Sequence, residues 1–214
     1  MKKALIFDLD GTLWNASQAI IDSWNDTLEH LGIKKNLSMD YIQSLQGLQM
    51  DEIARKVFPE YPEKKAFSLM EKLEAGENAY VEEHGGDLYP KLRETLEKLK
   101  DEGRFMAIVS NCQKGYIEAF YTAHGMEDLF DDQECYGNTL VSKDQSIRIL
   151  MKRNGIEDAW YIGDIEKDYK AASGADIGFI HANYGFGQVD GVPQLEQVCD
   201  LPDLLADLEE KDHD

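Results

Sequence analysis

The sequence has few of the features that indicate a disulfide-bonded, nucleic-acid-binding or membrane-spanning protein. Its 214 residues include three cysteines, an odd number at unrelated spacings, which gives neither a disulfide framework nor a zinc-site pattern. Lysine and arginine number 22 against 42 acidic residues, and the net charge of −20 argues against nucleic-acid or anionic-membrane partners. No apolar run is long enough for a signal peptide or a membrane span. We therefore expect a reducing, cytoplasmic location.

Length and composition instead fit a globular protein with a sizeable core, built as one large domain or as a core with a smaller insertion. Hydrophobic residues make up 43% and charged residues 30% of the chain, which is ordinary for a globular protein. Since the net charge is −20, local positive groups must hold any anionic substrate against the overall field. The C-terminal residues 209–214 are mostly acidic, and we expect them to form a frayed tail.

The most informative segment is Phe7-Asp8-Leu9-Asp10-Gly11-Thr12. It includes the end of the apolar run Ala4–Phe7, which predicts a strand buried on both faces of a parallel sheet. Alternation along the chain places Asp8 and Asp10 on the same side. Ligands of open α/β sheets bind at the carboxyl ends of strands, where these two carboxylates fall. The alternative is an Asp-Gly turn that only ends the strand.

Further apolar runs alternate with amphipathic segments along the chain. Leucines at helical spacing between Pro90 and Gly103 predict one helix, and Ser142 with Gln145 predicts a capping box that opens another. Alternating strands and helices are typical of an α/β fold with a doubly wound parallel sheet. The further predicted strands are Phe105–Val109, Ala159–Ile162, Ile177–Ile180 and, more weakly, Glu134–Tyr136.

Residues 15–86 lack this alternation of strands and helices, because their apolar spacing predicts helices only. We expect them to form an inserted α-helical cap domain of residues 15–85, and residues 1–14 and 86–214 to form the core domain. The pair Gly85-Gly86, where the chain re-enters the core, is either a hinge or a plain loop. The predicted helices follow apolar stripes at residues 20–31, 42–45, 53–57 and 62–81.

Polar residues follow three of the predicted strands at one edge of the sheet. Each has an ordinary explanation when taken alone, as a helix cap, a turn, a solvated charge or an acid in the first turn of a helix. Their convergence on one edge, in this order, is much harder to explain by coincidence and predicts a functional site. The residues are Asp8 and Asp10, then Ser110-Asn111, then Lys143 at the start of a helix on the same side, then Asp164 and Asp168.

This pattern resembles the haloacid dehalogenase superfamily, and the resemblance covers the core. Asp8-Leu9-Asp10-Gly11-Thr12 matches the family's first motif, which is specific. Ser110 matches the second motif and Lys143 the third, both of which are weak alone. Asp164 with Asp168 matches the fourth, which is specific. The resemblance implies a Rossmann-like core and a type 1 helical cap. The chain is most similar to the phosphoglycolate phosphatase branch, including Tyr184-Gly185-Phe186-Gly187, a segment that is otherwise consistent with a simple turn.

The resemblance implies that Asp8 is the nucleophile, which forms an aspartyl-phosphate. A carboxylate is already ionised at neutral pH and needs no activating base, which agrees with this role. Magnesium would be held by Asp8, by the backbone carbonyl of Asp10 and by Asp164. Asp10 would protonate the leaving oxygen and then activate the water that cleaves the intermediate.

The remaining motif residues are expected to bind the phosphoryl group or to support those that do. Hydrogen bonds and positive charge there would offset the negative charge of the substrate. Asp168 would orient Lys143 or support the metal. The expected phosphate-binding residues are Gly11, Thr12, Ser110, Asn111 and Lys143, of which Ser110 and Lys143 are also expected to be catalytic.

The chain departs from the family pattern at two places. Trp14-Asn15 stands where an acidic residue is often found, and no proline follows Lys143. The expected specificity loop of the cap, Leu45–Gln49, offers amide side chains. The nearest cationic residues, Arg55 and Lys56, are better explained as exposed helix charges.

The expected substrate is a small phosphorylated metabolite, either phosphoglycolate-like or a phosphosugar. A phosphosugar mutase on the same scaffold is the first alternative, and a non-catalytic binding or regulatory module is the second. The presence of all four motif aspartates favours catalysis over the second alternative. A dehalogenase is disfavoured because it needs no acid at position 10, and a phosphonate hydrolase because no Schiff-base lysine can be placed in the cap.

Overall fold

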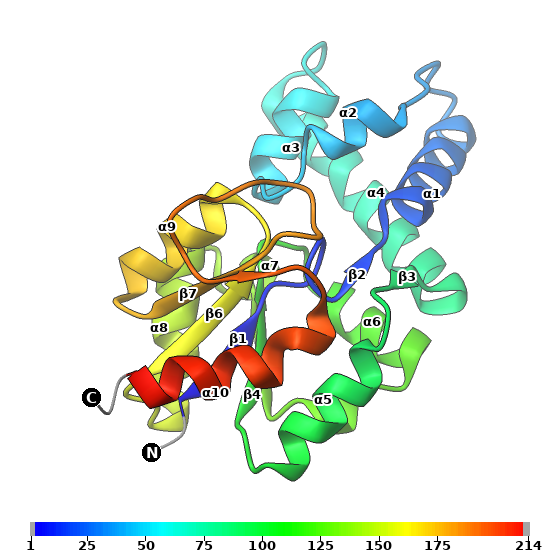
Figure 1. Cartoon of the computed structure of the whole chain (residues 1–214). Helices are drawn as coiled ribbons and strands as arrows, with labels where there is room; N and C mark the ends of the chain where they lie inside the picture. The colour runs from blue at the N-terminus through cyan, green and yellow to red at the C-terminus, as the bar shows by residue number, and fades with distance from the viewer. Residues whose placement is uncertain (1–2, 212–214) are drawn as a thin grey trace.

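A computed structural model describes residues 3–211 and contains a six-stranded parallel sheet (Figure 1). Helices flank both faces of the sheet, and β1 lies between β4 and β6 near its centre. This arrangement confirms the predicted doubly wound α/β fold. In spatial order the strands are β5 (Asp132–Cys135), β4 (Met106–Ser110), β1 (Ala4–Phe7), β6 (Ala159–Gly163), β7 (Gly178–Ala182) and β8 (Gln194–Leu195).

The central strand is apolar because both of its faces are covered. All four residues of β1 are at most 7% exposed. Leu5 and Phe7 face one hydrophobic cluster and Ile6 faces the other, as the alternation of side chains in a strand requires. Phe7 pairs with Ile108 of β4 and with Ile162 of β6, so the three strands end at the same edge.

Helices α8 and α9 cover one face of the sheet, and helices α5, α6 and α10 cover the other. The predicted stripe of leucines in α5 is buried, with Leu92, Leu96 and Leu99 at most 1% exposed. The helices of this part are α5 (Leu92–Asp101), α6 (Tyr116–His124), α7 (Tyr136–Thr139), α8 (Lys143–Asn154), α9 (Glu166–Ala175) and α10 (Leu201–Lys211), with short 3-10 turns at Glu127–Leu129 and Val198–Asp200.

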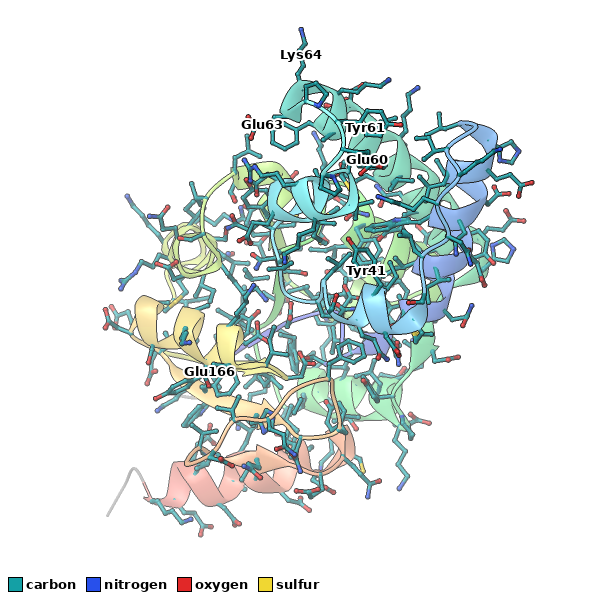
Figure 2. The ribbon with its side chains drawn as sticks, turned by 90° about the horizontal axis from the view of Figure 1, so that it is seen from above. Tyr41, Glu60, Tyr61, Glu63, Lys64 and Glu166 are labelled. Atoms are coloured by element: carbon teal, nitrogen blue, oxygen red, sulfur yellow. The ribbon has the colours of Figure 1, made fainter. Side chains whose placement is uncertain are left out.

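The insertion after β1 contains four helices, which lie beyond the carboxyl edge of the sheet (Figure 1). Figure 2 shows Glu63 and Lys64 at its outer rim. The prediction of helices only was incomplete, because Trp14 and Asn15 pair with Leu88 and Asp87 in a two-stranded antiparallel ribbon. This ribbon ties the point where the chain leaves the core to the point where it returns. The elements are β2 (Trp14–Asn15), α1 (Ser17–His30), α2 (Met39–Gln43), α3 (Met50–Val57), α4 (Glu63–His84) and β3 (Asp87–Leu88).

Close packing accounts for the two glycines at the re-entry point. Gly85 ends α4 with a φ of +71°, a conformation that favours glycine. A Cβ atom on Gly86 would lie 3.0 Å from the Cα of Ala16. Both glycines are therefore required by the local backbone, and a hinge role for them stays a prediction.

The predictions of a weak strand at 134–136 and of a capping box at Ser142 were wrong in part. The weak strand lies at Asp132–Cys135 rather than at 134–136, because Tyr136 begins α7. Ser142 is the N-cap of α8, but its side chain forms no capping hydrogen bond, so the predicted capping box does not form.

The predicted acidic tail is also shorter than expected. Residues 209–211 form the last turn of α10, where Glu209 pairs with the buried guanidinium of Arg104. Residues 212–214 lie outside the described part of the chain. Within residues 3–211, none of the helices combines the length and the apolar character that crossing a bilayer requires.

Candidate active site

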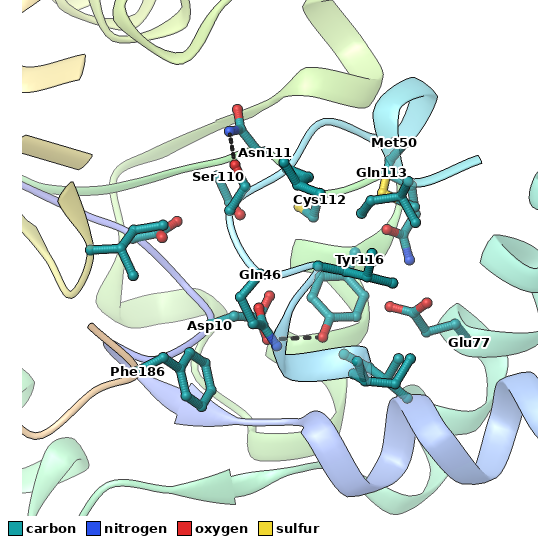
Figure 3. A pocket seen from close by; sticks show the side chains of 18 of the residues that line it. Asp10, Gln46, Met50, Glu77, Ser110, Asn111, Cys112, Gln113, Tyr116 and Phe186 are labelled. Carbon is teal, nitrogen blue, oxygen red and sulfur yellow. Dashed lines mark hydrogen bonds between the residues drawn. The ribbon is translucent and has the colours of Figure 1, made fainter. Parts of the chain in front are cut away.

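A cavity of ≈ 70 Å³ lies between the carboxyl edge of the sheet and the inserted helices (Figure 3). Parallel strands present their carboxyl ends at one edge, so loops that are far apart in sequence meet there. The cavity brings together six of the residues that the sequence singled out: Asp8, Asp10, Ser110, Asn111, Lys143 and Asp164.

Asp8 follows β1 directly and is only 5% exposed. The ammonium group of Lys143 lies 3.0 Å from its Oδ1 atom, but this oxygen has no aligned hydrogen bond. Burial and the nearby charge of Asp168 raise the pKa of Asp8 to about 7, while Lys143 opposes the shift. The charge of Lys143, which Asp168 shares, therefore does not fully offset the burial of Asp8.

Lys143 and Asp168 form a buried ion pair behind Asp8. The Lys143 ammonium donates a 2.6 Å hydrogen bond to Oδ1 of Asp168. The other oxygen of Asp168 accepts the backbone N–H groups of Asp164 and Ile165, at 3.1 and 3.2 Å. Burial alone would lower the pKa of Lys143, but Asp168 and Asp8 hold it well above its usual value. Asp168 thus fixes the charged Lys143 and the start of α9 together.

Asp10 lies two residues beyond Asp8, and its side chain faces the cavity. Its Oδ1 atom accepts a 3.1 Å hydrogen bond from the hydroxyl of Tyr116, in α6 (Figure 3). Burial raises the pKa of Asp10 to about 6, and the Tyr116 hydroxyl limits this rise. A carboxyl group with such a pKa can both give and accept a proton near neutral pH.

Asp164 follows β6 and is 1% exposed. Its Oδ2 atom accepts a 2.7 Å hydrogen bond from the backbone N–H of Phe186. Burial, together with the charges of Asp168 and Asp8, raises the pKa of Asp164 to about 8. A Cβ atom on Gly185 would lie 2.3 Å from the Cβ of Asp164, so only glycine allows this approach. The segment 184–187 therefore positions Asp164 and is more than a simple turn.

The donor atoms at this edge fit a magnesium ion. Carboxylate oxygens of Asp8, Asp164 and Asp168 lie within 4.8 Å of one another. Both oxygens of Asp168 are already hydrogen-bonded, which leaves Asp8 and Asp164 as the available ligands. Magnesium prefers oxygen ligands. Burial and the neighbouring carboxylates raise the pKa of both groups, and a bound cation would offset that cost.

The structure places Gly11 and Thr12 outside the lining of the cavity, and their predicted phosphate-binding role stays a prediction. Their N–H groups bond to the carbonyls of Trp14 and Leu9, and the Thr12 hydroxyl has no hydrogen-bond partner among the described residues. Gly11 has a φ of +81°, and a Cβ atom there would lie 2.1 Å from Oδ2 of Asp164. Thr12 is fully buried. Both residues shape the turn that holds Asp8 and Asp10.

Asn111 contacts the inserted helices as well as the cavity. Its side-chain amide donates a 3.2 Å hydrogen bond to the carbonyl of Gly47, and Lys167 reaches the same oxygen at 3.3 Å. Gly47 belongs to the predicted specificity loop, which lines the cavity. Arg55, in contrast, forms surface ion pairs with acidic neighbours, as expected for an exposed helix charge.

Glu77, the acidic group that the inserted helices bring to the cavity, was not singled out from the sequence. Glu77, in α4, lies at the cavity (Figure 3). It is 3% exposed and accepts a hydrogen bond from the indole N–H of Trp24, in α1. Burial raises the pKa of Glu77 to about 8, although Gln113 and Trp24 oppose the shift as hydrogen-bond donors. The signal was present in the sequence, since Glu77 interrupts an apolar stripe between Leu73 and Val81.

Comparison with known sequences places the chain in a family. Residues 5–182 match the family model for haloacid dehalogenase-like hydrolases. The chain is 30% identical over 213 residues to a phosphoglycolate phosphatase of Rhodobacter capsulatus, covering 95% of each protein. It is 24% identical to a phosphoglycolate phosphatase of Synechococcus elongatus, covering 96% of this chain and 92% of the relative.

Solved structures share the fold. A haloacid dehalogenase-like hydrolase from Bacteroides fragilis aligns with a TM-score of 0.80 and 21% identity, over 94% of this chain and all of the other. CbbY from Rhodobacter sphaeroides, in complex with phosphate, aligns with a TM-score of 0.80 and 19% identity, over 94% and 96% of the two chains. With its motif aspartates gathered at the carboxyl edge of the sheet, the chain belongs to the haloacid dehalogenase-like hydrolases.

Proposed function

We propose that this hydrolase is a magnesium-dependent phosphatase that cleaves a small phosphomonoester through an aspartyl-phosphate on Asp8. The observation that carries the proposal is the arrangement of two carboxyl groups with different partners in one cavity. Asp8 lies 3.0 Å from the Lys143 ammonium, and Asp10 is hydrogen-bonded to Tyr116. The first is suited to attack a phosphoryl group, and the second is suited to move a proton.

In the first step, a carboxylate oxygen of Asp8 forms a bond to phosphorus, and the bond between phosphorus and the ester oxygen breaks. Asp10 gives its proton to that leaving oxygen, so the product departs as a neutral alcohol. Lys143 and Ser110 offset the negative charge on the phosphoryl oxygens. Asp168 keeps Lys143 in place through their 2.6 Å hydrogen bond.

In the second step, Asp10 takes a proton from a water molecule that attacks the aspartyl-phosphate. The bond between phosphorus and Asp8 breaks, which releases inorganic phosphate and restores both carboxyl groups. Asp8, Asp164 and the backbone carbonyl of Asp10 would hold the magnesium ion. When bound, the ion supplies positive charge to the phosphoryl group and to the two carboxylates.

We further propose that residues 15–85 act as a cap over a core formed by residues 1–14 and 86–214. The position of the inserted helices over the site favours a small substrate over a bulky chain such as a phosphoprotein. We propose either a phosphoglycolate-like compound or a phosphosugar as the substrate. The sequence relatives named phosphoglycolate phosphatase support the phosphoglycolate-like compound. The structure of a CbbY variant in complex with xylulose-(1,5)bisphosphate supports the phosphosugar.

A phosphate-release assay over phosphorylated metabolites, with magnesium and with chelator, tests the proposal. We expect turnover of at least one small phosphomonoester with magnesium, loss of turnover in chelator, and recovery when magnesium is restored. The Asp8→Asn variant should be inactive in the same assay, because an amide cannot form the acyl-phosphate. Full activity in chelator, or in Asp8→Asn, would contradict the proposal.

A further inference from the structure

The cap side of the cavity presents an acidic group and no basic one. Glu77 lies at the cavity with 3% of its surface exposed. Among the described residues that line the cavity, Lys143 is the single basic side chain, and it belongs to the core. Lys143 is already engaged by Asp8 and Asp168, so it is suited to the phosphoryl group rather than to the far end of a substrate.

Three backbone donors of the cap loop are used within the loop itself and do not replace the missing basic side chain. The N–H groups of Leu45, Gln46 and Leu48 bond to carbonyls of residues 42, 43 and 45 within the same turn. They therefore cannot bind an anion. The side chain of Gln46 also lines the cavity, but its amide carries no charge.

The partners of Glu77 favour its role as a hydrogen-bond acceptor. The indole N–H of Trp24, which can only donate, points to Oε2 of Glu77. The amide nitrogen of Gln113 donates a 3.0 Å hydrogen bond to Asn78, and the Gln113 amide also lowers the pKa of Glu77. A carboxylate has about four acceptor sites, so these contacts leave room for a substrate donor. Aliphatic side chains of Ile20, Ile42 and Ile53 line the same cavity and strengthen any such contact by excluding water.

We propose that Glu77 selects phosphomonoesters whose leaving group ends in a hydroxyl or ammonium group, and discriminates against leaving groups that end in a carboxylate. The inference rests on the proposed phosphatase function and narrows its substrate class. A terminal hydroxyl or ammonium group donates to Glu77, and an ammonium group also supplies the positive charge that the buried carboxylate lacks. A terminal carboxylate would place another acid beside Glu77, where the inserted helices offer the cavity no basic side chain among the described lining residues.

Three esters of nearly equal size test this inference: 2-aminoethyl phosphate, 2-hydroxyethyl phosphate and 2-phosphoglycolate. They differ in the terminal group, which is positive, neutral or negative. We expect kcat/KM at pH 8.5 with magnesium to be at least about tenfold higher for the amino or hydroxyl ester than for phosphoglycolate. The ratio of kcat/KM between the amino ester and the hydroxyl ester tells whether charge or hydrogen bonding dominates the contact with Glu77. p-Nitrophenyl phosphate, which has no such terminal group, reports the phosphatase activity separately.

The Glu77→Gln variant removes the charge but keeps an oxygen that Trp24 can bond. We expect it to reduce the preference against phosphoglycolate at least about fivefold. The preference is measured as a ratio of kcat/KM values, so that a general change in activity cancels. Glu74→Gln is the matched control, because it removes an acid from the same helix outside the cavity, and it should keep the wild-type preference.

Hydrolysis of p-nitrophenyl phosphate together with a preference for phosphoglycolate would overturn this inference and leave the phosphatase proposal standing. A wild-type preference that Glu77→Gln leaves unchanged would also overturn it. No hydrolysis of any of the four esters would overturn both.

Discussion

The hydroxyl of Tyr116 donates a 3.1 Å hydrogen bond to Oδ1 of Asp10, although the two residues are 106 positions apart in the sequence. The contact joins α6 to the turn that follows β1. Asp10 cannot swing away from the cavity without losing this bond, and Trp14 packs edge-on against the same tyrosine ring, with centroids 5.6 Å apart. Tyr116 is thus a positioning residue for the proposed proton carrier.

Replacing Tyr116 with phenylalanine tests this positioning role. We expect Tyr116→Phe to lower kcat for an alkyl phosphate about tenfold, because a hydrogen bond to a charged group contributes about 1.5–3 kcal/mol. Steady-state kinetics should show little change in KM. Tyr121→Phe is the control, because Tyr121 lies in the same helix and its ring stacks on Phe130 away from Asp10. Equal activity of Tyr116→Phe and wild type would exclude the role.

The placement of the motif residues could be predicted because it depends on a simple property of parallel sheets. Asp8, Ser110 and Asp164 each end or follow a strand, and strands of one direction end at one edge. The β2–β3 ribbon could not be predicted, because two residues per strand show no alternation. Glu77 was missed for a different reason. An apolar stripe predicts that a helix face is buried, but not which part of that face borders a cavity.

The buried pair of Lys143 and Asp168 makes a prediction about stability. Asp168→Asn should lower the free energy of unfolding by about 3 kcal/mol, since Lys143 would lose a charged partner in a site without solvent. Chemical denaturation measures this change. Glu166→Gln in the same helix is the control, because its side chain is 57% exposed and its ion pair with Lys170 contributes at most about 1 kcal/mol. Similar decreases in the free energy of unfolding of both variants would show that the buried pair stabilises the fold no more than an exposed ion pair does.

The raised pKa of Glu77 predicts how stability changes with pH. The folded protein holds a proton on Glu77 up to a pKa of about 8, whereas the unfolded chain releases it near the ordinary value of 4.5. This group therefore stabilises the fold fully below pH 4.5, and the contribution is lost as the pH rises through 8.

Glu77→Gln should remove that dependence. The free energy of unfolding of the variant, relative to that of wild type, should rise by on the order of 3 kcal/mol between about pH 5 and pH 8.5. Urea denaturation at both pH values measures the gain, with Glu74→Gln as the control, since Glu74 is only partly buried. Parallel stability curves for Glu77→Gln and wild type would show that the carboxyl group is not buried as described.

Gly47 offers a test of cap closure. Its φ is +68°, and a Cβ atom there would lie 2.2 Å from the Ile165 side chain across the cap–core contact. We expect Gly47→Ala to lower kcat/KM for a small ester, because either the Ile165 side chain or the proposed cap must shift to make room for the methyl group. Gly32→Ala is a matched control, since Gly32 has the same φ of +68° and no atom within 4 Å of such a Cβ.

Both alanine variants should lose about 1 kcal/mol of stability from the left-handed conformation. Only Gly47→Ala should lose activity. Equal kcat/KM in the two variants would mean that the contact at Ile165 does not govern closure.

The central claim is that Asp8 carries the phosphoryl group and that Asp10 moves the proton. Acid-quenched single-turnover experiments on Asp10→Asn with p-nitrophenyl phosphate test it most directly. The nitrophenolate leaves without a proton, so Asp8 should still be phosphorylated, whereas the intermediate should persist because no base activates water. With an alkyl phosphate the same variant should form the intermediate roughly 10²–10⁴-fold more slowly than wild type. We expect one phosphoryl group on the peptide that contains Asp8. A label on another residue, or equal losses of the burst rate with both substrates, would contradict it.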